Sequence, residues 1–171
     1  RTLDYDGVFS YQSGAGLTTL RLVHVVIDGI EHERIIHLDG ARREFVRRGR
    51  EITRILQPKD KILELEKAVP PTPFVQAFSS RLDAIGDVYK VELNGSGRVA
   101  GRRAIRLRIV PRDEDRYGVG IWLDHATGLL LRYERYDLQG SRLEGFQFGH
   151  LTIGDIPRTA VIPEEHAGAV T

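Results

Sequence analysis

The sequence predicts a mainly β fold (α+β), in which a strongly curved antiparallel sheet carries one main amphipathic helix over its concave face. Three observations predict it. Segments with apolar residues at every second position run along most of the 171 residues, which is typical of half-buried strands. The connections between them are short and polar, so consecutive strands are expected to pair antiparallel. One further segment has apolar residues at helical spacing and needs a concave apolar surface to lie on.

Alternation predicts strands in both halves of the chain. In the first half the alternating segments are residues 6–12, 17–26, 30–38, 42–48 and 51–57. Asp28-Gly29 and Asp39-Gly40 predict tight turns, because these residue types tolerate positive φ. In the second half the segments are residues 88–93, 104–110, 119–123, 129–136 and 144–150, with a turn predicted at 94–97. A sheet of roughly nine to eleven strands must curl, close or split.

Between these halves the sequence predicts a connector and a helix. Residues 59–67 fit either a strand or one helical turn, and the prolines of residues 70–73 predict a stiff connector. Residues 74–84 carry an apolar stripe at helical spacing. After residue 154 the periodicity ends, which indicates a linker or tail over residues 155–171. The folded domain is therefore expected to span residues 1–154.

Composition excludes several classes of function. Lys and Arg number 25 against 24 Asp and Glu, a net charge of +1 that argues against nucleic-acid binding. There is no cysteine, so thiol catalysis, thiolate metal sites and disulfides are excluded. No apolar run approaches the ~20 residues of a transmembrane helix. There is no methionine even at position 1, and we expect the chain to start downstream of a native start.

No pattern predicts an enzyme, a cofactor or a metal site. The six histidines show no convincing ligand spacing. Asp113, Asp115 and Asp124 resemble a calcium loop only faintly, and a hairpin loop with Asp–Arg pairs is the better interpretation. Glu31 and Glu33 share a strand face, as a glycosidase pair would, but the charged outer face of an edge strand is favoured. No nucleophile or base is paired with an orienting group.

Two candidate binding sites remain. A curved sheet under a helix leaves an apolar cavity, and core packing is the alternative for each residue that would line it. Those residues are Phe9, Tyr11, Leu20, Leu22, Phe74, Phe78, Leu82, Ile105, Leu107, Ile121 and Leu131. The second candidate is a basic surface for acidic partners such as lipid phosphates or an acidic peptide, unless its arginines pair with carboxylates. It consists of Arg21, Arg106, Arg108 and Arg132.

Nine short segments, spread along nearly the whole chain, carry a resemblance to a known family. They are residues 5–11, 21–24, 33–40, 43–44, 111–113, 116–118, 122–124, 127–132 and 146–148. In this order they resemble the MucB/RseB family of periplasmic regulators. Family members carry a smaller C-terminal domain after such a linker, which these residues do not include.

The resemblance implies a LolA/LolB-like half-barrel in the periplasm. It also implies a negative regulator of envelope-stress signalling, which binds the periplasmic region of an anti-sigma factor and protects it from proteolysis. Lipid or lipopolysaccharide acyl chains would release that hold. A periplasmic carrier of lipoproteins or lipids is the alternative function. The sequence leaves open whether the chain forms a homodimer.

Overall fold

The computed structural model describes residues 3–40, 43–56, 89–111 and 118–163. Within it the chain divides into two compact units. The first unit contains Arg1–Ser10, Thr18–Asp60 and Gly149–Thr171, and the second contains Tyr11–Leu17 and Lys61–Phe148. The predicted helix at residues 74–84 and the mixed segment at 59–67 lie outside the described residues.

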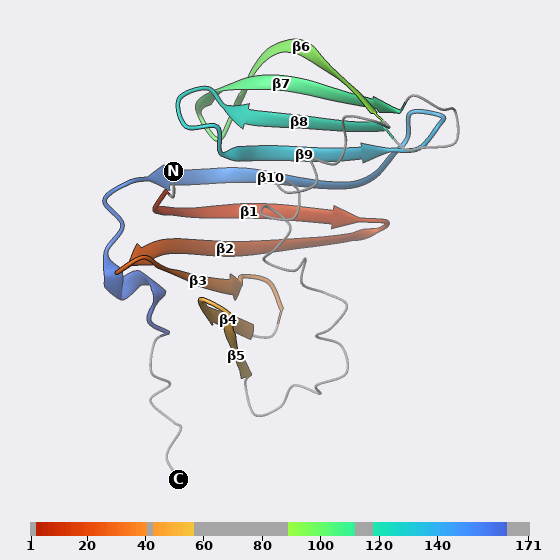
Figure 1. The fold of residues 1–171 in the computed structure, drawn as a ribbon. Helices are drawn as coiled ribbons and strands as arrows, with labels where there is room; N and C mark the ends of the chain where they lie inside the picture. The colour runs from red at the N-terminus through yellow and green to blue at the C-terminus, as the bar shows by residue number, and fades with distance from the viewer. Residues whose placement is uncertain (1–2, 41–42, 57–88, 112–117, 164–171) are drawn as a thin grey trace. The chain divides into compact units, whose positions relative to one another are not determined.

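Ten strands follow one another along the described chain (Figure 1). They are β1 (Tyr5–Ser13), β2 (Gly16–Ile27), β3 (Ile30–His37), β4 (Arg43–Arg48), β5 (Glu51–Leu56), β6 (Tyr89–Val99), β7 (Arg102–Pro111), β8 (Gly118–Asp124), β9 (Leu130–Tyr136) and β10 (Arg142–Ile153). Their order in the sheet is β5-β4-β3-β2-β1-β10-β9-β8-β7-β6. Each half of the chain is therefore a meander, and β1 and β10 each contribute residues to both units.

The predicted antiparallel pairing is confirmed from β2 to β5 and from β6 to β10. The Asp28-Gly29 turn is confirmed as well. Its two residues have φ values of 51° and 76°, and Ile27 pairs with Ile30 on either side of it. Two positive φ values let a two-residue loop follow the twist of the strands that it joins.

The predicted turn at residues 94–97 is wrong. Residues 89–99 form one strand, and the register between β6 and β7 shifts between Leu93 and Ser96. Gly95, with φ of 85°, takes up this irregularity. The hairpin turn lies instead at Ala100-Gly101, with φ values of 52° and 74°. An extra residue in one strand produces a bulge when the strand pairing continues beyond it. Glycine is common in both bulges and turns, so the sequence did not distinguish the two.

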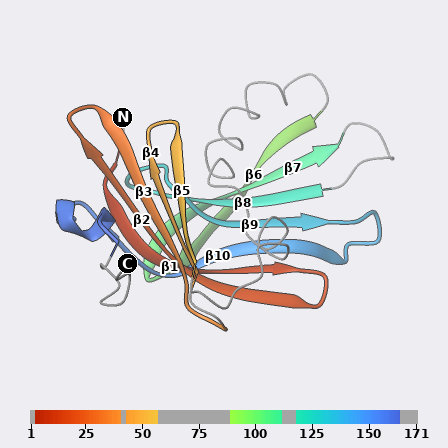
Figure 2. The same ribbon diagram turned by 90° about the horizontal axis from the view of Figure 1, so that it is seen from below.

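In the first unit, the segment after β10 packs against β2. A short 3-10 helix, η2 (Arg158–Val161), follows Pro157. The buried side chain of Val161 contacts the cluster of Val23 and Val25, and Ile156 packs against the same cluster. Figure 2 shows η2 at the side of strands β1 to β3, and η2 also contacts β3. The start of the predicted linker is thus packed on the domain, and its role as a connection stays a prediction.

The second unit has its core on one face of β7 to β10. Ile121 and Leu131 are fully buried there, and Phe146 and Phe148 are nearly so. The two phenylalanine rings meet edge to face with centroids 5.2 Å apart, a favoured aromatic geometry. The alternation of residues 144–150 predicts that Phe146 and Phe148 share one strand face, and this is confirmed. None of the helices among the described residues is long and apolar enough to cross a bilayer.

Candidate functional site

The apolar candidates of the second unit share one sheet face. Leu107 pairs with Ile121, and Ile121 pairs with Tyr133. Because side chains alternate across a strand, Ile105, Leu107, Ile121 and Leu131 lie together on this side, which we call the apolar face. Ile121 and Leu131 are core residues, whereas Ile105 and Leu107 are half-buried. Ile105 and Leu107 thus keep part of their surface exposed.

The remaining apolar candidates are divided between the units. Phe9, Leu20 and Leu22 are buried in the first unit. Tyr11 belongs to the second unit, where its hydroxyl donates to Glu144 Oε2 at 3.1 Å. Phe74, Phe78 and Leu82 lie outside the described residues. Whether the predicted set lines one cavity therefore stays a prediction.

The apolar face continues onto the edge strand β6. Val91 and Leu93 pair with Ile109 and Leu107, so they lie on the same side of the sheet. They are nevertheless 49% and 74% exposed. Exposed apolar side chains next to a buried apolar face are typical of a surface that binds an apolar partner.

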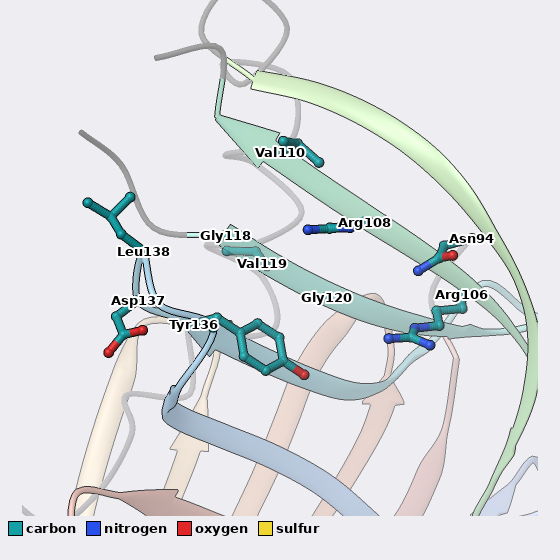
Figure 3. A pocket seen from close by; sticks show the side chains of 11 residues that line it. Asn94, Arg106, Arg108, Val110, Gly118, Val119, Gly120, Tyr136, Asp137 and Leu138 are labelled. Atoms are coloured by element: carbon teal, nitrogen blue, oxygen red, sulfur yellow. The ribbon is translucent and has the colours of Figure 1, made fainter. Parts of the chain in front are cut away.

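An open pocket of about 500 Å³ lies on the opposite side of the same strands, which we call the polar face. Figure 3 shows Asn94, Arg106 and Arg108 on one side of it, and Tyr136, Asp137 and Leu138 on the other. Its floor contains Gly118 and Gly120. A Cβ at Gly120 would lie 3.3 Å from the Trp122 ring. The absence of a side chain at this position therefore leaves space in the pocket next to the ring.

A stack of charged and aromatic side chains crosses the polar face beside the pocket. The Arg106 guanidinium lies 5.0 Å from the Trp122 ring centroid, and that of Arg132 lies 4.4 Å from it. Both distances are within the range of cation–π attraction. Arg132 Nε donates to buried Glu134 at 2.8 Å, and Arg142 lies 3.7 Å from the same carboxylate. Within this stack, the Trp122 ring contacts one face of the Arg106 guanidinium.

The predicted basic surface is only partly assembled. Arg106, Arg108 and Arg132 share the polar face, since Arg106 pairs with Trp122 and Trp122 with Arg132. Arg21 is in the first unit and donates to Asp6 at 2.7 Å. Sequence reasoning missed the contributions of Asn94 and Tyr136, because Asn94 was assigned to a turn and the register was unknown. Alternation in residues 119–123 places Trp122 opposite Val119, Ile121 and Leu123, so its side of the strand can be predicted from the sequence.

The interpretation of Glu31 and Glu33 as the outer face of an edge strand is wrong. β3 lies between β2 and β4, and Glu33 is only 4% exposed. Arg47 bridges the two carboxylates, with Nε 2.9 Å from Glu33 and a terminal nitrogen 3.2 Å from Glu31. His24 Nδ1 donates to the Leu3 carbonyl at 2.7 Å. This buried cluster was missed because charge pattern does not report which strands are neighbours.

The residues of the faint calcium motif have other surroundings where the structure describes them. Asp113 and Asp115 lie outside the described residues. Asp124 accepts from Arg102 Nε at 2.9 Å and from the Thr127 hydroxyl at 2.7 Å. Burial acts to raise the pKa of Asp124, but the hydrogen bonds from Arg102 and Thr127 outweigh it and lower that pKa. Across the described ranges, no three His, Asp or Glu side chains gather to hold a metal ion.

Comparison with known proteins gives consistent matches. The family model described as MucB/RseB N-terminal domain matches residues 1–166. The chain is 34% identical over 158 residues to "Sigma factor AlgU regulatory protein MucB" of Pseudomonas aeruginosa, covering 92% of this chain and 48% of that protein. It is 29% identical over 153 residues to "Sigma-E factor regulatory protein RseB" of Haemophilus influenzae, covering 90% and 48%.

A solved structure agrees with these sequence matches. The crystal structure of MucB in complex with MucA(peri) has a TM-score of 0.75 to this chain at 30% identity. The match covers 95% of this chain and 55% of that one. The chain spans about half the length of the curated relatives it matches.

Proposed function

Because the chain belongs to the MucB/RseB family, whose N-terminal domain it matches, we propose that it regulates an envelope-stress sigma factor from the periplasm. It does so by binding the periplasmic region of an anti-sigma factor and shielding that region from proteolysis. The observation that carries this proposal is the likeness to MucB, solved in complex with MucA(peri), over 95% of the chain.

Lipid or lipopolysaccharide sensing forms the second part of the proposal. The apolar face offers half-buried Ile105 and Leu107, and it continues to exposed Val91 and Leu93. Acyl chains would gain roughly 25 cal/mol for each Å² of apolar surface that they remove from water there. We infer that an acyl chain on this face competes with the anti-sigma segment.

Co-purification with an anti-sigma periplasmic fragment, with and without lipopolysaccharide, tests the proposal. The fragment should be retained by the chain and released when lipopolysaccharide is added. Leu93→Asp places a charge on the apolar face, and it should abolish the effect of lipopolysaccharide. Leu93 is 74% exposed, so the variant is expected to fold.

Leu17→Asp is the matched control. Leu17 is 66% exposed in the β1–β2 hairpin, away from β6 in the strand order. This variant should respond to lipopolysaccharide as the parent chain does. A chain that retains no fragment would refute the regulatory role. Transfer of a bound acyl chain to an acceptor, without any anti-sigma contact, would favour a carrier.

A further inference from the structure

Arg106 ends the stack on the polar face without a carboxylate partner among the described residues. Arg132, on the other side of Trp122, is neutralised by Glu134. The indole ring of Trp122 lies beneath the Arg106 guanidinium, 5.0 Å from it. Trp122 in turn lies against Gly97 and Gly120, since a Cβ at either would be 3.3–3.5 Å from its ring. The position of Arg106 is thus supported by the ring, and its N–H groups form no hydrogen bond with another residue of the described ranges.

Arg108 adds a second positive charge at the same pocket. It lies two residues along β7, on the same face as Arg106, and it forms no ion pair within the described part of the chain. Asn94 contributes an amide from the bulge in β6 and lines the same pocket. Two guanidinium groups and an amide thus line one pocket, and together they offer several N–H donors to an anion with several oxygens.

We propose that this pocket binds a phosphate group through Arg106, Arg108 and Asn94. The site is separate from the proposed lipid surface, because Arg106 and Arg108 alternate with Ile105 and Leu107 along β7 and lie on the opposite sheet face. It does not depend on anti-sigma binding, and either proposal can fail without the other.

The rest of the pocket indicates which kind of phosphate compound fits. About 500 Å³ exceeds the size of an inorganic phosphate ion and falls within the usual range of small-molecule sites. Tyr136, Val110 and Leu138 line it, so the ester group should be apolar or flat. Asp137 lies at the far side, where it accepts from the backbone of Gln139 and Ser141 at 3.0 and 2.8 Å. Its negative charge would repel a second anionic group at that side, so a ligand with one phosphate at the arginine side fits better than a polyanion.

Trp122 provides the readout, because it is the one tryptophan of the sequence and stacks on Arg106. Its fluorescence should change saturably with butyl phosphate, more weakly with inorganic phosphate, and not with butanol. Isothermal titration calorimetry should give the same affinities. Vesicles of phosphatidylcholine with or without phosphatidic acid separate a membrane source of phosphate from a soluble one. A hexaglutamate peptide tests the acidic-peptide alternative.

Charge-neutral variants identify the residues involved. Arg108→Gln and Arg106→Gln should each weaken butyl phosphate binding about tenfold, since each removes a charge-assisted hydrogen bond. Arg103→Gln is the control: Arg103 is exposed and lies on the other face of β7 from Arg106 and Arg108, so the variant removes the same charge and affinity should stay unchanged.

Three results would overturn the proposal. They are the absence of saturable binding to the parent chain, an equal loss in Arg103→Gln, and tighter binding of hexaglutamate than of any phosphate.

Discussion

The buried ion pair of Arg34 and Glu44 supports a quantitative prediction about the first unit. The Arg34 guanidinium donates to Glu44, and the two side chains are only 6% and 1% exposed. Arg34 also reaches the Ala160 carbonyl at 3.4 Å, which connects the pair to η2. Replacing Glu44 with glutamine keeps its volume but leaves the arginine charge buried without a counter-charge.

The expected cost follows from this burial. Two unit charges 4 Å apart attract by about 4 kcal/mol at an effective dielectric constant of 20. Removing one member of a buried pair typically costs about 3–5 kcal/mol. We therefore expect Glu44→Gln to lower the free energy of unfolding by about 3 kcal/mol. For a chain of this size, that corresponds to a fall in Tm of roughly 6–12 °C.

Urea unfolding followed by circular dichroism measures the change, and Trp122 fluorescence reports the second unit separately. Glu92→Gln is the matched control, because the Lys90–Glu92 pair is exposed at 3.2 Å and should contribute at most about 0.5 kcal/mol. Replacing both buried partners, as Arg34→Met with Glu44→Leu, should recover much of the loss. A loss below about 1 kcal/mol in Glu44→Gln would refute the reasoning, since the pair would then not be desolvated as described.

Three further predictions concern other parts of the fold. Asp124→Asn should reduce stability at pH 7, and this loss should shrink as the pH falls below about 4. The pKa of folded Asp124 is lowered, so its stabilisation is complete above the unfolded pKa and is lost as the pH falls through the folded pKa. Urea titrations over a series of pH values check this. Gly101→Ala should cost about 1 kcal/mol in thermal unfolding, because φ is 74° there, whereas Gly118→Ala, with open space at its Cβ, should cost less. Val161→Ala should cost about 1–2 kcal/mol and speed proteolysis after residue 154; unchanged cleavage would contradict the packing of η2 on β2.

The sequence alone predicted the strands and the faces of their side chains. Alternation is a local property, so Leu107 and Ile121 could be placed on the apolar face and Trp122 opposite them without any coordinates. The Asp28-Gly29 turn was equally readable, because two adjacent residues that tolerate positive φ are sufficient to specify it. By contrast, Ala100-Gly101 was missed, since alanine gives little sign of its φ of 52°.

Only the tertiary structure decided which strands are neighbours and which charges are buried. Strand pairing joins residues far apart in the chain, as when β1 lies beside β10, and no local pattern reports it. Glu33 and Glu44 have charged sequence neighbours like those of exposed glutamates, yet both are buried because β3 and β4 lie inside the sheet order. The pocket of Asn94, Arg106 and Tyr136 likewise exists because the register aligns the four strands β6 to β9, and register is set by the whole sheet.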